Sequence, residues 1–284
     1  MNLKLLKSGA LIAVLSCASL GQQLIAATNV ISSGQQANPL GMIEESSQLL
    51  GQPFKSSEGA SLGKLQDMVV DLESGHILYA VLSANGKNYA FPPNLLRPAA
   101  DKKSLVAHAP KAKITAAPVF SESDANLANP SFAASVFQYY GLQAWWDNGS
   151  GAASGKNFGN VHRLSQLNGA TVQSSANQNL GRIDNSILDL RSGHVAFLIL
   201  NASSLLGNAN ALLAVPPNAF TAGQNAKVLV TGLDKNTLAS APRWTRNNLN
   251  ELSNPAKAAS IYSFYGKQPY FQSGTGLSPT GRNP

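Results

Sequence analysis

Hydrophobic and polar positions follow the same order twice along the chain. In the first half, an aliphatic-rich segment at 62–71 leads through a Leu-x-Ser-Gly turn into a β-branched and aromatic segment at 76–82. The second half repeats this order at 180–189 and 194–200. Short apolar segments with a glycine turn between them are typical of antiparallel strands. We therefore predict one β-hairpin in each half.

Shorter strands are expected around each hairpin. Residues 52–54 precede the first hairpin, and residues 89–91 follow it and end at a Pro-Pro pair, which cannot donate to a sheet ladder. A further strand is predicted at 227–231, with 104–107 as its weaker match in the first half. Short strands at close spacing favour a small barrel or sandwich.

Each half is expected to end in a helix, at 123–141 and at 248–266. An Asn-Pro pair near the beginning of each segment supplies N-cap and first-turn signals, and a glycine stands where each helix should stop. Aromatic residues follow both glycines. We therefore expect a helical, aromatic-rich extension after each set of strands.

The two halves match closely enough to indicate a duplication. Gln48 matches Gln166 at a spacing of 118 residues (166 − 48), whereas Pro92 matches Pro216 at 124 (216 − 92). The second copy therefore carries a net insertion of 6 residues, within 201–213. Chance similarity rarely keeps its register over such a span, so we interpret the chain as one unit used twice.

Each copy carries one motif: a Leu-Gly-x-[Leu/Ile] sequence, an aspartate on the next strand, a Ser-Gly turn and a final residue before proline. In the first copy the motif is Leu62-Gly63-Lys64-Leu65, Asp71, Ser74-Gly75 and Phe91-Pro92. In the second copy it is Leu180-Gly181-Arg182-Ile183, Asp189, Ser192-Gly193 and Val215-Pro216. In this motif each copy resembles the PRC-barrel, a small β-barrel named after the H subunit of the photosynthetic reaction centre. The resemblance implies a scaffold or adaptor, since such barrels dock on partner proteins without catalysing a reaction.

The predicted fold class is mainly β, with two small PRC-barrel-like β-barrels in tandem, each followed by a short helical, aromatic-rich extension. The boundaries that we predict are 1–27 for a signal peptide, 28–43 for an N-terminal linker, 44–146 for repeat 1, 147–161 for a Gly/Ser-rich linker, 162–271 for repeat 2 and 272–284 for a disordered tail.

The first residues predict export. Lys4 and Lys7 form a basic start, 11–20 is a short apolar run, and small residues end at Ala27. We expect cleavage there and a periplasmic protein without a transmembrane segment in the mature chain. Cys17 is the only cysteine and would leave with the signal. The alternative is a lipoprotein anchored through Cys17, because the residues before it loosely resemble a lipoprotein box.

Composition argues against nucleic acid as a partner. Charged residues make up 12% of the chain, about half the usual ~25%. The formal net charge is +7, but the lysines and arginines are scattered along the sequence. A nucleic-acid surface needs clustered positive charge. We expect the partner to be another envelope protein.

His76 and His194 recur at the first position of equivalent strands. A histidine there could be a metal ligand or a pH sensor, but no second His or Cys lies nearby in sequence to complete a metal set. We therefore expect half-exposed strand residues and predict no metal and no cofactor. A catalytic role would require a nucleophile and a carboxylate around one of these rings.

The repeated aspartates are expected to brace the hairpin turns. Asp71 and Asp189 would accept hydrogen bonds from backbone N–H groups ahead of Gly75 and Gly193, the glycines that can take a positive φ. No third partner suggests a catalytic carboxylate pair.

The aromatic stretches are the better candidates for binding. Exposed, their rings would form a surface for a partner or a sugar; buried, they would cap the barrel. The residues are Tyr139, Tyr140, Trp145, Trp146, Phe264, Tyr265, Tyr270 and Phe271. We therefore expect no enzyme but an exported binding or adaptor module that docks on an envelope protein or a ligand. The alternatives are an envelope-associated hydrolase and a structural envelope protein.

Overall fold

The computed structural model describes residues 40–120, 127–146, 158–207, 211–223, 225 and 227–272. These residues belong to one unit, Ala37–Pro284. The predicted signal peptide with Cys17, most of the predicted linkers and nearly all of the predicted tail lie outside the described residues. Among the described residues, no helix is long and apolar enough to cross a membrane.

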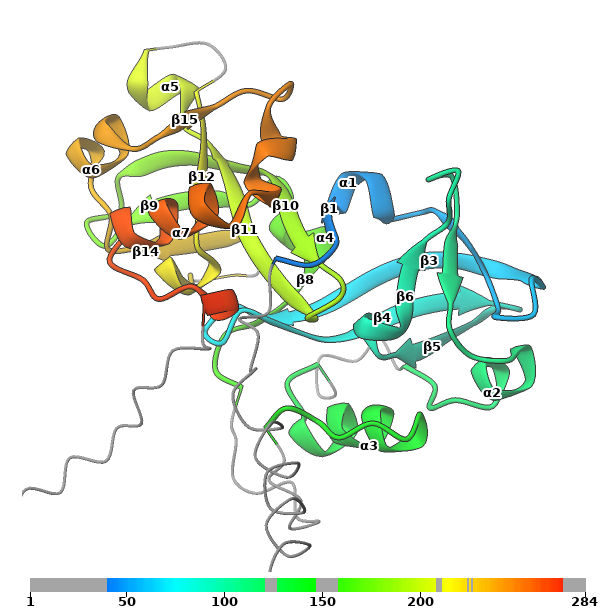
Figure 1. Ribbon diagram of the computed structural model, residues 1–284. Coiled ribbons are helices and arrows are strands. Elements are labelled where there is room, and N and C mark those ends of the chain that lie inside the picture. The colour runs from blue at the N-terminus through cyan, green and yellow to red at the C-terminus, as the bar shows by residue number, and fades with distance from the viewer. Residues whose placement is uncertain are drawn as a thin grey trace, which may run out of the picture. The chain divides into compact units, whose positions relative to one another are not determined.

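The first half is built on six strands (Figure 1). Their order is β5-β4-β3-β2-β7-β6, and only the β2–β7 pair is parallel. The strands are β2 (Pro53–Lys55), β3 (Ser61–Asp71), β4 (His76–Ala84), β5 (Lys87–Phe91), β6 (Leu96–Pro98) and β7 (Leu105–Ala107). The predicted hairpin is β3–β4, and β5 ends where the 3₁₀ turn η1 (Pro93–Leu95) begins.

The second half repeats this strand order as β12-β11-β10-β9-β14-β13, again with one parallel pair, β9–β14. Its strands are β9 (Thr171–Ser174), β10 (Asn179–Asp189), β11 (His194–Asn201), β12 (Leu212–Val215), β13 (Phe220–Ala222) and β14 (Val228–Thr231). A short strand, β15 (Arg243–Trp244), pairs with β12. The mainly β fold class and the hairpin in each half are thus confirmed.

One glycine in each half permits a close approach between hairpin strands. A Cβ on Gly63 would lie 1.8 Å from the carbonyl oxygen of Ser83, and one on Gly181 would lie 2.2 Å from that of Asn201. No side chain fits at such distances. The glycine in the Leu-Gly pair of each copy is therefore required by the backbone of the neighbouring strand.

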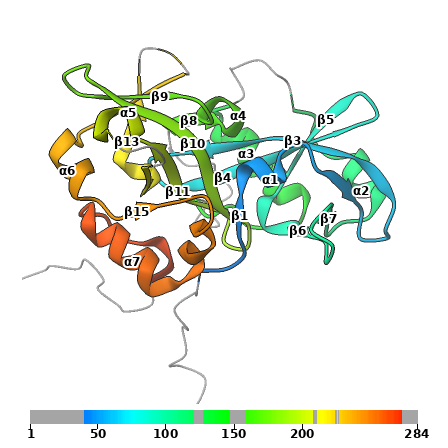
Figure 2. The same ribbon diagram turned by 90° about the horizontal axis from the view of Figure 1, so that it is seen from above.

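The segments that lead into the two halves are exchanged. Strand β1 (Ile43–Glu45) pairs with β10 of the second half, as can be followed in Figure 2. Strand β8 (Val161–Arg163) pairs in the equivalent register with β3 of the first half. The short helices behind them, α1 (Ser46–Leu49) and α4 (Leu164–Leu167), contact the same strands. Each half therefore completes its sheet with residues from the other.

Polar side chains hold the exchanged segments in place. Ser46 Oγ donates to Asn185 Oδ1 at 2.7 Å, and Ser165 Oγ donates to Asp67 Oδ2 at 2.5 Å. Asp67 and Asn185 are equivalent buried positions in the middle of β3 and β10. Both accept from the incoming helix, and Asn185 also donates from Nδ2 to Glu45 Oε2 at 2.7 Å, a bond that a carboxylate could not form.

The helices are shorter than the predicted segments. Helix α3 (Pro130–Tyr139) and helix α7 (Pro255–Phe264) both begin after an asparagine N-cap, Asn129 and Asn254. The side chain of each asparagine accepts hydrogen bonds from two backbone N–H groups of the first turn. The part of the second segment before Pro255 forms a 3₁₀ turn, η4 (Leu249–Ser253). The remaining short helices are α2 (Lys111–Thr115), α5 (Ser203–Leu206), α6 (Lys235–Ser240) and the 3₁₀ turn η5 (Tyr270–Gln272).

Two apolar clusters form the core. The larger contains residues of both halves. The smaller lies in the first half, where Val69, Leu78 and Tyr79 of β3 and β4 pack with Val136 and Phe137 of α3. Helix α3 contacts β4 and β5 on one face of the sheet, Val69 of β3 belongs to the same cluster, and the last part of β3 is buried on both sides. This explains why its sequence alternates only in part.

Candidate functional site

The hairpin turn of the first half is braced by a buried carboxylate. Asp71 accepts hydrogen bonds from the backbone N–H groups of Glu73 and Ser74, at 3.4 and 3.2 Å, and from Ser74 Oγ at 2.6 Å. Gly75 follows with a φ of 74°. Both carboxylate oxygens of Asp71 accept hydrogen bonds from the turn that follows it, which is the geometry of a structural residue.

The second turn uses the equivalent carboxylate with different neighbouring donors: Ser192 Oγ donates to the backbone carbonyl of Asp189 at 3.5 Å, and the N–H of Gly41 donates to Asp189 Oδ2 at 3.1 Å. Asp189 accepts from the backbone N–H groups of Arg191 and Ser192, at 3.1 and 3.3 Å, and Gly193 has a φ of 70°. Tyr270 also donates its hydroxyl to Asp189 Oδ2 at 3.2 Å. This bond ties the C-terminal aromatic stretch to the hairpin.

The two repeated histidines meet where the halves join. His76 and His194 are cross-strand partners of β4 and β11, and their ring centroids are 3.9 Å apart. Trp145 stacks on His76 with centroids 3.6 Å apart, and Tyr270 stacks on His194 at 4.1 Å. The four rings form a row of two stacked pairs joined by a tilted contact, at 43°, between the two histidines; we call this row the junction column. It joins both hairpins to both aromatic extensions.

His194 is neutral at neutral pH. Burial lowers its pKa to about 4, although a hydrogen bond to the Ser192 backbone and the charge of Asp189 act in the opposite direction. Its Nδ1 lies 3.0 Å from the carbonyl oxygen of Ser192, and a carbonyl only accepts, so this nitrogen carries the proton.

This protonation state bears on the hydrolase alternative. Ser192 Oγ lies 3.2 Å from the same Nδ1 of His194. A nitrogen that already donates to a carbonyl cannot remove the hydroxyl proton, so the contact is not a nucleophile–base pair. Asp189 bonds to backbone groups of the turn and does not orient the imidazole. In the described part of the chain, no group of three His, Cys, Asp or Glu is arranged to hold a metal ion.

The predicted aromatic residues divide between core and surface. Four are buried, namely Tyr140, Trp146, Tyr265 and Phe271, and two are partly buried, Tyr139 and Tyr270. Trp145 and Phe264 are exposed, at 37% and 38%. Most of these rings therefore pack the extensions onto the sheets, and only two present substantial area to a partner.

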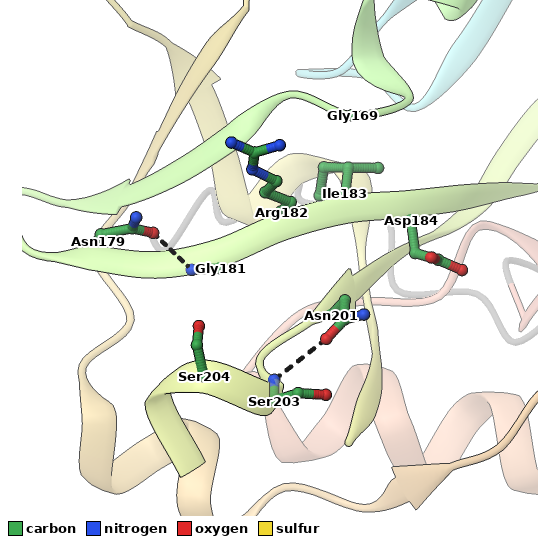
Figure 3. A pocket seen from close by; sticks show the side chains of 9 residues that line it. All are labelled: Gly169, Asn179, Gly181, Arg182, Ile183, Asp184, Asn201, Ser203 and Ser204. Carbon is green, nitrogen blue, oxygen red and sulfur yellow. Dashed lines mark hydrogen bonds between the residues drawn. The ribbon is translucent and has the colours of Figure 1, made fainter. Parts of the chain in front are cut away.

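A cavity of about 460 Å³ lies in the second half (Figure 3). Its volume falls within the range of small-molecule sites. One wall is strand β10, and the opposite wall comes from the end of β11 and helix α5. The polar residues that line it are Asn179, Arg182, Asp184, Asn201, Ser203 and Ser204.

The cavity depends on the insertion that distinguishes the second copy. Between β11 and β12 the chain forms α5, which supplies Ser203 and Ser204 to the wall. In the first half a tight turn, Asn85-Gly86, joins β4 directly to β5. The residues equivalent to Arg182 and Asp184 are Lys64 and Gln66. The first half thus has neither the helix nor the carboxylate.

Some polar groups of the residues that line the cavity have hydrogen-bond or ion-pair partners, and others do not. Asp184 Oδ1 pairs with Arg246 Nη2 at 2.7 Å, while its Oδ2 is buried and has no hydrogen-bond partner among the described residues. Arg182 is exposed and forms no ion pair within the described part of the chain. The side-chain oxygens of Asn179 and Asn201 accept hydrogen bonds from the backbone N–H groups of Gly181 and Ser203, respectively. The side-chain Nδ2 groups of the two asparagines can therefore act as donors.

A family model for the PRC-barrel domain matches residues 43–114, from β1 into α2. This confirms the predicted resemblance for the first half. No curated protein matches the chain.

Two features were not predicted from the sequence. The first is the contact between His76 and His194, and the second is the cavity of the second half. The recurrence of a histidine at 76 and 194 did not predict their contact, because only the pairing of His76 with His194 between β4 and β11 brings the two rings together. The signal for the second was the insertion within 201–213, whose conformation no periodic pattern predicted.

Proposed function

We propose that the protein is a non-catalytic, exported binding module made of two PRC-barrel-type units, and that the second unit holds the ligand. The second half supports this description by its strand order, by the close approach at Gly181 and by the turn at Asp189. Exchange of the leader segments makes the two units one scaffold. A scaffold of this kind keeps a binding cavity preorganised.

The observation that carries the proposal is the cavity beside β10 and α5. It is large enough for a small molecule, and one of its lining residues, Asp184, has a buried carboxylate oxygen without a partner among the described residues. Buried polar groups in native proteins are normally satisfied, so an unsatisfied one marks a place where a bound molecule or water belongs.

The test is native mass spectrometry of the mature protein purified from its own periplasm. We expect a small molecule to accompany the protein. Ser204→Trp fills the cavity from the exposed face of α5 and should remove the bound mass, whereas Ser135→Trp, on the exposed face of α3, should retain it. A bound mass that survives Ser204→Trp would place the ligand elsewhere, and no bound mass in any sample would overturn the proposal.

A second candidate function is docking on an envelope protein. Trp145 and Phe264 are exposed large rings, and aromatic side chains are frequent anchors of interfaces. A cross-linked pull-down from the envelope fraction tests it. One dominant partner, lost with Trp145→Ala and Phe264→Ala but kept with Val119→Ala, would support the adaptor function. Val119 is a suitable control because it is 52% exposed and is not aromatic.

The structural alternative is supported by a different feature, the apolar cluster that contains residues of both halves. A protein that only shapes the envelope would not need the cavity. The hydrolase alternative requires a base for Ser192, and the hydrogen bond from His194 to the Ser192 carbonyl argues against it.

A further inference from the structure

The fold gathers four lysines of the first half that are scattered along the sequence. Lys55 ends β2, Lys64 lies near the beginning of β3, and Lys87 begins β5. Lys111 begins α2, and all four residues are exposed. Figures 1 and 2 show the β2–β3 turn, the β4–β5 turn and α2 at one end of the first half. These four lysines are here called the lysine patch.

Strand pairing brings three of them close together. On β2, Lys55 stands two residues from the partner of Lys64. Lys64 and Lys87 pair with adjacent residues of β4. Neighbouring strands lie about 4.8 Å apart, so each of these lysines has its backbone within about 10 Å of the next. Charges at such separations reinforce one another at physiological ionic strength.

The fourth lysine is joined to the same end through the β2–β3 turn. The backbone N–H of Lys111 donates to Glu58 Oε2 at 3.1 Å, and that of Ser57 donates to the carbonyl oxygen of Ala109 at 3.0 Å. Glu58 is the exposed carboxylate of this turn. Within the described residues, none of the four lysine ammonium groups forms an ion pair. The lysine patch therefore presents positive charge that the protein itself does not neutralise.

The second half does not reproduce this charge. Its equivalent positions, identified by the same strand pairing, carry Gln173, Arg182, Ala211 and Lys235. Only two of the four are cationic, and Asp234 precedes the last of them. The shared fold therefore does not require lysine at these positions.

We infer that the lysine patch docks the protein on a membrane surface that carries anionic phospholipid headgroups. Lysine is a point charge on a flexible stem and needs no fixed partner geometry, which suits a fluid layer of phosphate groups. Interfaces between proteins are depleted in lysine, and nucleic-acid sites add arginine or aromatic side chains that contact bases. The inference uses the export that we propose, but it does not depend on the cavity.

The test is co-sedimentation of the mature protein with vesicles made of equal parts of phosphatidylglycerol and phosphatidylcholine, compared with vesicles of phosphatidylcholine alone. We expect binding to the anionic vesicles only, and a steady loss of binding as salt screens the charges. A variant without the lysine patch should bind at least about tenfold more weakly, because each lysine near an anionic surface adds to the attraction. Its four substitutions are Lys55→Gln, Lys64→Gln, Lys87→Gln and Lys111→Gln.

The matched control removes four positive charges from the second half and should bind the anionic vesicles nearly as well as the unmodified protein. Its substitutions are Lys227→Gln, Lys235→Gln, Arg243→Gln and Lys267→Gln. Equal weakening in the two variants would show that net charge acts without a patch, and the inference would be wrong.

Three other results would also overturn the inference. They are no binding to anionic vesicles at low salt, equal binding to phosphatidylcholine alone, and tighter binding of a duplex oligonucleotide or of polyglutamate than of the vesicles. The small molecule expected in native mass spectrometry should remain bound to the variant without the lysine patch. The inference and the proposed function can therefore fail separately.

Discussion

Mild acid should destabilise the protein through His194. Burial lowers the pKa of this histidine from 6.5 to about 4, so the folded protein binds the proton less readily than the unfolded chain. The resulting stability is complete above about pH 6.5 and decreases as the pH falls towards 4. Since one pKa unit corresponds to about 1.4 kcal/mol, this histidine alone makes about 3 kcal/mol of the free energy of unfolding depend on pH.

The environment of His194 explains the size of the effect. One face of the ring is covered by Tyr270 and the other by His76, and Nδ1 donates to the Ser192 carbonyl. The charged group nearby is Asp189, which favours the protonated form, but burial outweighs it. Protonation therefore places a charge inside the junction column, where only part of its hydration is replaced.

The assay is urea unfolding followed by tryptophan fluorescence at several pH values between 7 and 4. His194→Gln keeps an amide donor near the Ser192 carbonyl but does not titrate, so its free energy of unfolding should fall less steeply with acidification. His108→Gln is the control, because His108 is exposed. The pKa of His162 is also lowered by burial, but His162 contributes equally to all three proteins. If His194→Gln and His108→Gln show the same pH dependence, the reasoning is refuted.

Two further substitutions test the fold. Gly63→Ala places a Cβ 1.8 Å from the Ser83 carbonyl oxygen and should cost about 3 kcal/mol in urea unfolding, whereas Gly232→Ala, with open space around it, should be nearly neutral. An equal effect of the two would show that β3 and β4 do not approach so closely. Ser165→Ala removes the hydroxyl donor of the Asp67 carboxylate and should cost about 1 to 2 kcal/mol in the same assay. Unchanged stability would indicate that the exchanged helix α4 does not depend on this bond.

The strands of each hairpin were predictable because their signals are local. Alternation, β-branched residues and a Leu-x-Ser-Gly turn specify β3–β4 and β10–β11 within about twenty residues of chain. The Asn-Pro pairs likewise predicted where α3 and α7 begin, since an N-cap acts on its own first turn. The longer helical segments expected around them were wrong in extent, because Pro255 separates a 3₁₀ turn from the helix.

The exchange of leader segments was not predictable in the same way. Strands β1 and β8 have three residues each, too few for a periodic pattern, and their partners lie more than ninety residues away in either direction. The sequence of each repeat is compatible both with pairing inside its own half and with pairing to the other half, so it does not distinguish the two arrangements. The aromatic residues posed a related problem, because composition does not distinguish Trp146 in the core from Trp145 beside it at the surface.

The exchange of β1 and β8 between the halves also determines whether the two halves need to be covalently connected. Because β1 completes the sheet around β10 and β8 completes that around β3, each half leaves an unpaired edge when the other is absent. Two separate polypeptides, one ending after Trp146 and the other beginning before Phe158, would still carry every exchanged contact. Such a split pair should reassemble on co-expression, and either fragment alone should aggregate. In that sense the protein is a dimer of fragments whose subunits are joined in one chain.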